Sequence, residues 1–209
     1  MNQRPLVPLV PLVIATRNPG KLLELRALIR ELPFRLLDLN SFPAVQTVPE
    51  TGSSFVENAS LKAVGYAAQI HEMTLADDSG LEVDALGGAP GVRSARYAGE
   101  GASDAERVDK LLSELSQVQI QERTARFVSA IAIADREGLI LNLSDGVCEG
   151  HITEFPRGSN GFGYDPVFIP KGFDQTFAEL PRPLKNRISH RSKALAAASD
   201  FLRRLTVSS

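Results

Sequence analysis

The 209-residue sequence has little cysteine and few aromatic residues: one cysteine, no tryptophan and 6% aromatic residues in all. A disulfide within the chain needs two cysteines, and a cysteine-based zinc site takes several. Cys148 alone therefore excludes both a disulfide framework and such a zinc site. A single cysteine fits a reducing compartment, so we expect a cytoplasmic protein.

The sequence also lacks an excess of charge of either sign. Its 23 Lys and Arg residues nearly balance its 25 Asp and Glu residues, which gives a formal net charge of -2. Proteins that bind nucleic acid usually show a strongly basic face, so this balance argues against nucleic acid as a partner. Local clusters of basic residues could still bind a single phosphorylated ligand.

The apolar stretch near the N-terminus is too short to span a membrane. It runs from Leu6 to Ala15 and is interrupted by Pro8 and Pro11. No small-residue cleavage pattern follows it, which argues against a signal peptide. We predict a flexible leader over residues 1–11 and one two-lobed domain over residues 12–207, with no membrane as a partner.

The composition and the hydrophobic patterns predict a globular α/β fold. Hydrophobic residues make up 43% of the sequence, and no tract is of low complexity. Periodicity predicts strands over residues 12–15, 35–39, 81–83, 126–134, 139–143 and 146–153, and helices over residues 22–32, 55–70, 104–115 and 190–205. Because strands and helices alternate early and hairpins follow, we expect a mixed central sheet flanked by helices, with two lobes around an active cleft.

Two adjacent carboxylates, Asp77 and Asp78, follow the apolar residues Leu75 and Ala76. Where a buried strand ends at a Ser-Gly turn, both carboxylates can face a cleft. There they suit a hard divalent cation and a general base for one of its waters. The alternative is a solvated turn, because Asp, Ser and Gly all favour turns. The segment taken alone favours the solvated turn, and the motifs around it favour the site.

The segment from Thr16 to Lys21 joins the first predicted strand to the first predicted helix. Amide groups at the start of the helix, the helix dipole and the lysine could together bind an anion. The pattern is not a Walker motif, and the alternative is an ordinary loop with a solvated lysine. Glu50 and Lys62 also have interpretations without a functional role. Glu50 could be a solvated loop acid, and Lys62 could be a lysine that extends to solvent from the 55–70 helix.

A glycine-rich segment, residues 157–168, contains Phe162 and Tyr164. Glycines let the backbone approach a ligand, and an aromatic ring there can stack on a flat base; alternatively, both rings fill the core. Further along the chain, His190 and Arg191 fall in the first turn of a predicted helix. The helix dipole disfavours cations at that end, which suggests an anionic or carbonyl-bearing partner.

Seven motifs, in order along nearly the whole chain, carry a resemblance to a known family. They are Ala15 to Lys21, Glu50 to Gly52 with Phe55 to Ala59 and Lys62, Ala76 to Leu81, Leu86 to Gly91, Ser94 to Tyr97, Gly161 to Pro166, and Ser189 to Arg191. Together they resemble the inosine triphosphate pyrophosphatase family, in particular its bacterial dITP/XTP branch. The resemblance implies a magnesium-dependent homodimer that hydrolyses ITP, dITP and XTP to the monophosphate and pyrophosphate, which keeps these bases out of DNA and RNA.

The resemblance also implies roles for individual residues. Asp78 would be the general base and a magnesium ligand, Glu50 would help to hold the metal, and Asp77 would lie nearby. The residues that would bind the substrate are Thr16, Arg17, Asn18, Pro19, Gly20, Lys21 and Lys62 at the triphosphate, and Ser79, Phe162, Gly163, Tyr164, Asp165, Lys185, His190 and Arg191 around the rest of the nucleotide. Arg17 departs from the pattern, because many relatives carry glycine there. Arginine adds charge beside the phosphates but leaves the backbone less free to approach them.

Two other classes of function are compatible with parts of the sequence. One is a regulatory module that binds a nucleotide and hydrolyses nothing, against which Lys21, Lys62 and the Asp77–Asp78 pair argue. The other is a hydrolase of the Maf type, which acts on modified pyrimidine nucleotides. The motif from Ser189 to Arg191 and the loop from Gly161 to Asp165 fit that type poorly.

Overall fold

Within residues 9–207, which the computed structural model describes, six strands form one sheet in the order β2-β1-β3-β4-β5-β6. The strands are β1 (Val10–Ile14), β2 (Phe34–Asp38), β3 (Thr74–Val83), β4 (Thr124–Ala134), β5 (Ile140–Ile152) and β6 (Phe168–Pro170). β1 pairs in parallel with both β2 and β3, whereas β3, β4, β5 and β6 pair in antiparallel fashion. The prediction of a mixed α/β sheet is confirmed.

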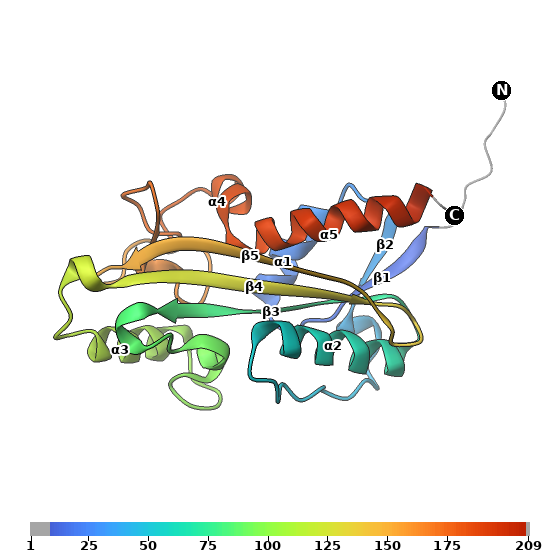
Figure 1. Cartoon of the computed structure of the whole chain (residues 1–209), viewed down its shortest axis with the longest axis horizontal. Helices are drawn as coiled ribbons and strands as arrows, with labels where there is room; N and C mark the ends of the chain where they lie inside the picture. The colour runs from blue at the N-terminus through green and yellow to red at the C-terminus, as the bar shows by residue number, and fades with distance from the viewer. Residues whose placement is uncertain (1–8, 208–209) are drawn as a thin grey trace, which may run out of the picture.

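Helices cover both faces of this sheet (Figure 1). They are α1 (Pro19–Ile29), α2 (Phe55–Ile70), α3 (Asp104–Glu114), α4 (Arg182–Ile188) and α5 (His190–Val207). One hydrophobic core lies between the sheet and α1 with α5, and a second lies under α2 on the opposite face. None of the helices in residues 9–207 has the length and hydropathy that crossing a membrane requires.

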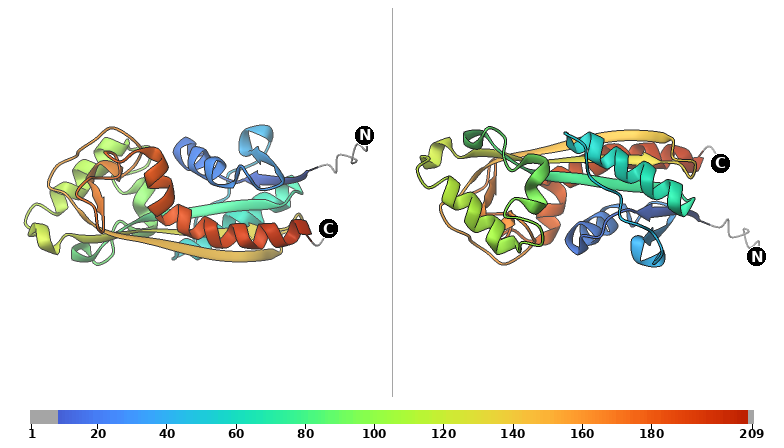
Figure 2. Two further views of the ribbon diagram at one scale, coloured as in Figure 1. Left: turned by 90° about the horizontal axis from the view of Figure 1, so that it is seen from above. Right: turned by 90° about the horizontal axis from the view of Figure 1, so that it is seen from below.

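The long strands β3, β4 and β5 connect two ends of the molecule (Figure 2). β1 and β2 lie at one end, α3 and β6 lie at the other, and α1 and α4 meet between them, where Lys185 donates to Glu24. A third hydrophobic core, built around Phe127, Phe168 and Phe177, fills the end that carries α3. β1 begins at Val10, two residues before the predicted start, and residues 1–8 of the predicted leader lie outside the described residues.

The predicted turn at Asp77–Gly80 is wrong, because these residues lie in the middle of β3. The strand pairs with β4 along its whole length, with Asp77 opposite Ile131 and Gly80 opposite Val128. Asp, Ser and Gly have low strand propensity, but hydrogen bonding to a central neighbour and burial override that local preference. The consequence is that the two carboxylates alternate between the faces of the sheet.

Two further predictions of local structure are corrected. The strands predicted over residues 139–143 and 146–153 are the single strand β5, since Asp145 and Gly146 pair with β4 like their neighbours. The short helix α4 was not predicted, because its seven residues contain too few apolar positions to show helical periodicity.

Gly146 allows α5 to approach β5 closely. A Cβ atom at this position would lie 2.3 Å from the carbonyl oxygen of His190 and 2.4 Å from the amide nitrogen of Ala194. Both atoms belong to the backbone of α5, so the helix could not make room by moving a side chain. The start of α5 is therefore held against the sheet at a position that only glycine permits.

We expect Gly146→Ala to lower the free energy of unfolding by about 2 kcal/mol, because the added methyl group overpacks a contact between two backbones. Urea unfolding at neutral pH measures this effect. Ser144→Ala is the matched control, since it changes the same face of β5 two residues earlier and adds no atoms. A Gly146→Ala protein as stable as the unmodified chain would contradict the close contact.

Candidate active site

The site lies where β1 and β3 part. β1 pairs with β3 only as far as Leu75, and β3 then continues to Val83. The start of α1 lies beside the edge of β3 that β1 leaves unpaired. There Asn18 caps the helix by accepting a hydrogen bond from the amide of Lys21 at 3.0 Å. The capped first turn holds Lys21 beside the Asp-Asp pair.

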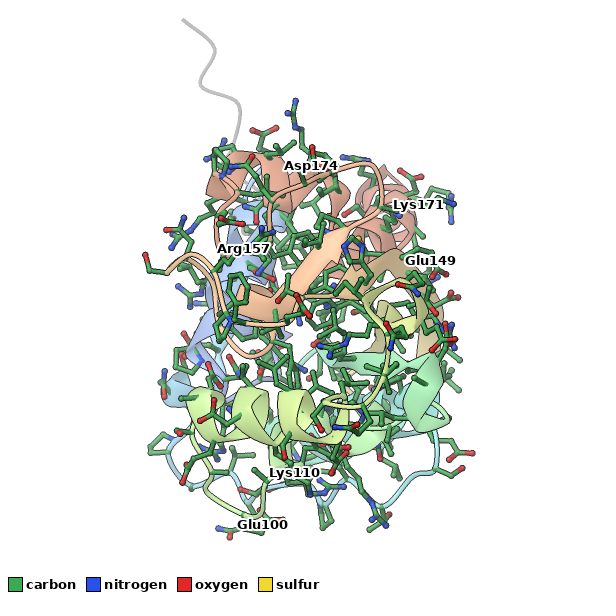
Figure 3. The ribbon with its side chains drawn as sticks, turned by 90° about the vertical axis from the view of Figure 1, so that its left-hand side faces the viewer. Glu100, Lys110, Glu149, Arg157, Lys171 and Asp174 are labelled. Carbon is green, nitrogen blue, oxygen red and sulfur yellow. The ribbon has the colours of Figure 1, made fainter. Side chains whose placement is uncertain are left out.

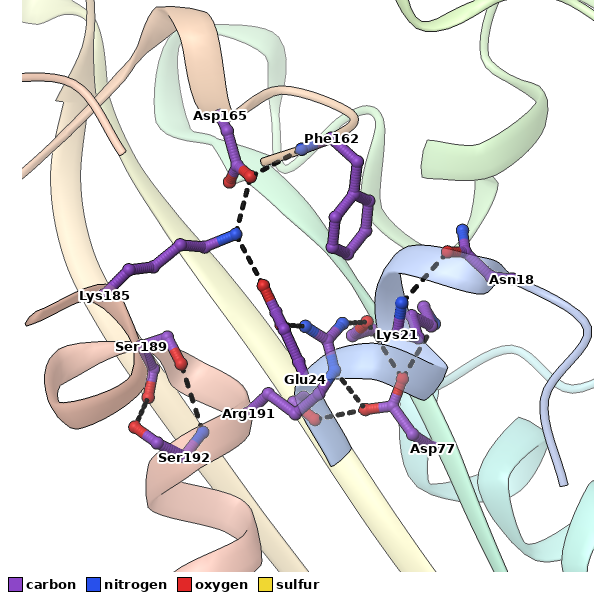
Figure 4. Close-up of polar contacts among 12 residues, drawn as sticks. Asn18, Lys21, Glu24, Asp77, Phe162, Asp165, Lys185, Ser189, Arg191 and Ser192 are labelled. Carbon is purple, nitrogen blue, oxygen red and sulfur yellow. Dashed lines mark hydrogen bonds and ion pairs between the residues drawn. The ribbon is translucent and has the colours of Figure 1, made fainter. Parts of the chain in front are cut away.

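Asp77 lies on the face of the sheet that α1 and α5 cover (Figure 4). One carboxylate oxygen lies 2.8 Å from Nζ of Lys21, and the other accepts a 2.6 Å hydrogen bond from Ser129 and lies 3.4 Å from Nε of Arg191. Burial acts to raise the pKa of Asp77, but Lys21 and Arg191 outweigh it and hold that pKa well below its usual range. Asp77 is therefore a permanent anion that joins α1 to α5.

Asp78 lies on the opposite face, under α2. Its Oδ1 atom accepts a 2.9 Å hydrogen bond from Nζ of Lys62, which also donates to Glu50 at 2.8 Å. Its Oδ2 atom is buried and has no hydrogen-bond partner among the described residues. Burial raises the pKa of Asp78, and the nearby Lys62 and Lys21 only partly oppose the rise. The neighbouring carboxylates thus have opposite chemistry: Asp77 is fully paired, and Asp78 keeps one oxygen available.

Glu24, which was not among the predicted site residues, connects two cations of the site. Its carboxylate accepts a 2.7 Å hydrogen bond from Lys185 and pairs with Arg191. Lys185 also donates to Asp165 at 2.6 Å. Burial raises the pKa of Glu24, but Arg191 and Lys185 lower it further, so the net effect is a lowered pKa. Lys21 and Glu24 share one face of α1, and this spacing is the one local signal that could have identified the acid.

The loop from Gly161 to Asp165 closes one side of the pocket. Its Phe162 ring lies against the start of α1, where a Cβ atom at Gly20 would come within 2.5 Å of the ring. The same ring lies 4.9 Å from Nζ of Lys185. The loop is held internally by Asp165, whose carboxylate accepts a 2.8 Å hydrogen bond from the amide of Phe162. The Arg191 guanidinium lies 5.7 Å from the centre of the ring. An aromatic ring beside these two cations, Lys185 and Arg191, suits a flat, electron-rich ligand.

The structure brings most of the predicted substrate residues to one pocket. Its lining contains the predicted residues Asn18, Lys21, Ser79, Phe162, Gly163, Tyr164, Asp165, Lys185, His190 and Arg191, and also Gly80, Ser94, Ala95, Asp104, Arg107 and Phe127, which were not predicted. Tyr164 is at the same time part of the hydrophobic core, as the alternative interpretation of its ring expected.

Other predicted residues lie around this pocket. Glu50 and Lys62 meet at Asp78 on the α2 side, and Pro19 and Gly20 form the first turn of α1. Thr16 accepts a 3.2 Å hydrogen bond from the amide of Asn18. The Arg17 side chain turns away and donates to the carbonyl of Val45 at 3.1 Å, so its charge is not directed into the pocket.

His190 is buried at the start of α5. Its ring stacks on Phe127, with centroids 4.7 Å apart, and its Nδ1 atom has no hydrogen-bond partner among the described residues. Burial, together with the nearby Arg191 cation, holds the pKa of His190 well below its usual range. The imidazole is therefore neutral at physiological pH.

This neutral histidine should make stability depend on pH. Below about pH 6.5 the unfolded chain binds a proton at His190 and the folded chain does not, so stability is lost by about 1.4 kcal/mol per pH unit as the pH falls. His190→Gln should remove this slope. Urea unfolding at several pH values between 7.5 and 5.5 compares the two proteins, and parallel stability curves would contradict a buried neutral imidazole.

Comparisons with known proteins place this fold and site in a family. The model of the Ham1 family matches residues 12–201. A dITP/XTP pyrophosphatase of Shouchella clausii is 49% identical over 191 residues, which cover 91% of this chain and 96% of that protein. A dITP/XTP pyrophosphatase of Geobacter sulfurreducens is 52% identical over 192 residues, which cover 91% of this chain and 96% of that protein. The solved structure of a HAM1 protein from Coxiella burnetii matches with a TM-score of 0.85 and 44% identity, covering 94% of this chain and 100% of that one. The chain therefore belongs to the Ham1 family, which confirms the resemblance seen in its motifs.

Proposed function

We propose that this chain hydrolyses ITP, dITP and XTP to the nucleoside monophosphate and pyrophosphate, and so keeps these purines out of DNA and RNA. The relatives named dITP/XTP pyrophosphatase support the substrate class, because they match this chain over nine-tenths of its length. The observation that carries the proposal is the Asp78 carboxylate. It is buried, with one oxygen on Lys62 and the other without a partner among residues 9–207.

The triphosphate would lie between α1 and Lys62. Lys21 and the positive end of the α1 dipole supply positive charge, as helix N-termini do for phosphate groups. The donor would be the amide of Gly20, because Pro19 has no N–H and the Lys21 amide is already bonded to Asn18. Lys62 faces the same region from α2 and is held by Asp78 and Glu50. Although burial lowers the pKa of Lys62, the two carboxylates raise it further, so this lysine remains a cation.

Mg²⁺ is the cofactor that we propose, with Asp78 and Glu50 as its protein ligands. The two carboxylates lie on either side of the Lys62 amine, and the free Oδ2 atom of Asp78 suits an oxygen-preferring cation. No group of three or more His, Cys, Asp or Glu side chains that could hold a metal occurs in the described part of the chain. Two carboxylates are enough for the proposed ion, because Mg²⁺ is often bound by one or two carboxylates plus substrate phosphates. Bound there, the metal would neutralise phosphate charge as pyrophosphate leaves.

Asp78 is the proposed general base. It would take a proton from a water molecule that attacks the α-phosphate, the bond between the α- and β-phosphates would break, and pyrophosphate would leave. The raised pKa of Asp78 suits this role, because a base whose pKa is closer to the working pH accepts a proton more readily. Lys21 would stay with the leaving pyrophosphate.

The base would occupy the pocket beside Phe162. Hypoxanthine and xanthine present a carbonyl oxygen at C6 and an N–H group at N1, whereas adenine presents the reverse pattern. Donors such as Arg191 and backbone N–H groups would pair with the carbonyl, and adenine would leave them unpaired in a buried site. Guanine shares the C6 carbonyl, so its rejection needs a separate contact.

We further propose that the chain works as a cytoplasmic homodimer. The single cysteine is consistent with a reducing compartment, and the dimer is the state that the family resemblance implies. Sedimentation equilibrium of the purified chain tests the dimer, for which a mass of twice that of one chain is expected. The mass of a single chain across the micromolar range would contradict it.

Product analysis tests the proposed reaction. With ITP and Mg²⁺, the expected products are inosine monophosphate and pyrophosphate, and a chelator should stop their formation. Release of orthophosphate would contradict cleavage between the α- and β-phosphates. Binding of ITP without turnover would favour the regulatory module, and turnover of modified pyrimidine nucleotides alone would favour the Maf type.

A further inference from the structure

Helix α3 forms a second wall of the pocket. None of the predicted site residues belongs to this helix. The side chain of Asp104, the first residue of α3, accepts a 2.7 Å hydrogen bond from the amide of Gly163. The two residues are 59 positions apart in the sequence, and both line the pocket. Figure 3 views this end of the molecule, with α3 across from the segment that carries Arg157 and Asp174.

Asp104 is itself held in place. It forms an ion pair with Arg107, one turn later in α3. The guanidinium of Arg107 also donates to the carbonyl groups of Ala95 at 2.8 Å and Ala102 at 2.5 Å. These contacts fix the Asp104 carboxylate relative to the short helix over residues 91–96, so it can act as a rigid acceptor for the loop opposite.

A second hydrogen bond reinforces the first. The hydroxyl of Tyr164 donates to the carbonyl of Ser94 at 3.0 Å. Ser94 in turn accepts a 2.9 Å hydrogen bond from the amide of Leu81 in β3 and donates to the carbonyl of Gly91 at 2.6 Å. The loop is thereby tied through neighbouring residues to both α3 and the central sheet.

The loop needs such restraint. Gly161 and Gly163 both have positive φ, at 80° and 62°, so the segment contains two of the least restricted residues of a chain. Between them lies Phe162, and Asp165 follows. Without the bond to Asp104, the Phe162 ring between these two glycines loses a restraint and can turn away from the pocket, whereas Asp165 stays bonded to Lys185 at 2.6 Å.

We propose that Asp104 is a positioning residue for base recognition. Its carboxylate holds the amide of Gly163 and so keeps the Phe162 ring directed at the base, while the triphosphate is bound elsewhere by Lys21 and Lys62. This inference rests on the proposed function, because it assigns Asp104 to the base end of the same site. Arg107 acts one step further back, by orienting Asp104.

Steady-state kinetics with ITP and a base-free competitor separate this role from a structural one. We expect Asp104→Ala to raise the KM for ITP about tenfold, as the loss of a hydrogen bond to a charged group predicts, with a smaller change in kcat. The inhibition constant of inorganic tripolyphosphate should stay within about twofold, since the phosphate contacts are intact. Asp104→Asn, which still offers an acceptor oxygen, should restore most of the affinity for ITP.

Asp109→Ala is the matched control, because it removes an exposed acid from the same helix and should leave all these constants unchanged. An unchanged KM for ITP in Asp104→Ala would overturn the inference. So would equal losses for ITP and tripolyphosphate accompanied by a lower melting temperature, which would make Asp104 merely structural. If the unmodified chain releases no pyrophosphate from ITP, the proposed function fails and the inference falls with it.

Discussion

Asp78→Asn is expected to lower kcat for ITP about a thousandfold, the size of effect that loss of a general base usually has. The amide is nearly isosteric with the carboxylate, but it cannot accept the proton of the attacking water and is a poor metal ligand. The substitution should leave the fold intact, because Lys62 keeps its 2.8 Å contact with Glu50.

The control for this prediction is a measurement of phosphate binding under conditions in which no hydrolysis occurs. The Asp78→Asn protein should still bind tripolyphosphate in the absence of metal, since Lys21 and Lys62 are unchanged, and its thermal melting should stay close to that of the unmodified chain. Turnover of ITP at a near-normal rate by a folded Asp78→Asn protein would exclude Asp78 as the base.

Asp77→Asn is expected to act on stability instead, with a loss of about 3–5 kcal/mol in the free energy of unfolding. Asp77 is buried between Lys21 and Arg191, and neutralising it leaves both cations without that partner. The charge-assisted hydrogen bond from Ser129 is weakened as well. Urea unfolding at neutral pH measures the difference.

Ser129→Ala is the graded control for Asp77. It removes the single 2.6 Å hydrogen bond and leaves every charge in place, so we expect a loss of about 1 kcal/mol. The comparison of the two adjacent residues is the informative result: Asp78→Asn should lower kcat, and Asp77→Asn should lower the free energy of unfolding. Equal stability of the Asp77→Asn and Asp78→Asn proteins would contradict the assignment of the two carboxylates to opposite faces.

The sequence was a good guide to the class of the fold and to the blocks that meet at the site. Strong periodicity identified α2 and α3, whose first turns are capped by the side chains of Ser54 and Ser103. The turn chemistry of Asp77 to Gly80 was misleading, because these residues are fixed in a strand by their pairing with β4, and local propensity does not report such pairing. Once these residues are placed in a strand, the alternation of side chains between the two faces of the sheet is enough to put Asp77 and Asp78 on opposite faces.

Residues whose importance lies in distant partners were missed. Glu24 sits among leucines in α1, and its partners Lys185 and Arg191 are 161 and 167 residues away in the sequence. Asp104 looks like an ordinary acid in the first turn of a helix, which is favourable there whatever else it contacts. The spacing of Lys21 and Glu24 places the acid on the site face of α1, but it does not reveal the distant partners, because only the folded chain brings them together.

The central claim is that this chain selects non-standard purine triphosphates and releases pyrophosphate from them. The most direct test is kcat/KM for pyrophosphate release from ITP, dITP, XTP, GTP and ATP, measured with Mg²⁺ under one set of conditions. We expect the values for ITP, dITP and XTP to exceed that for ATP about a hundredfold or more, because adenine leaves buried donors unpaired. Equal values for ITP and ATP, or no pyrophosphate from any of the five, would contradict the claim.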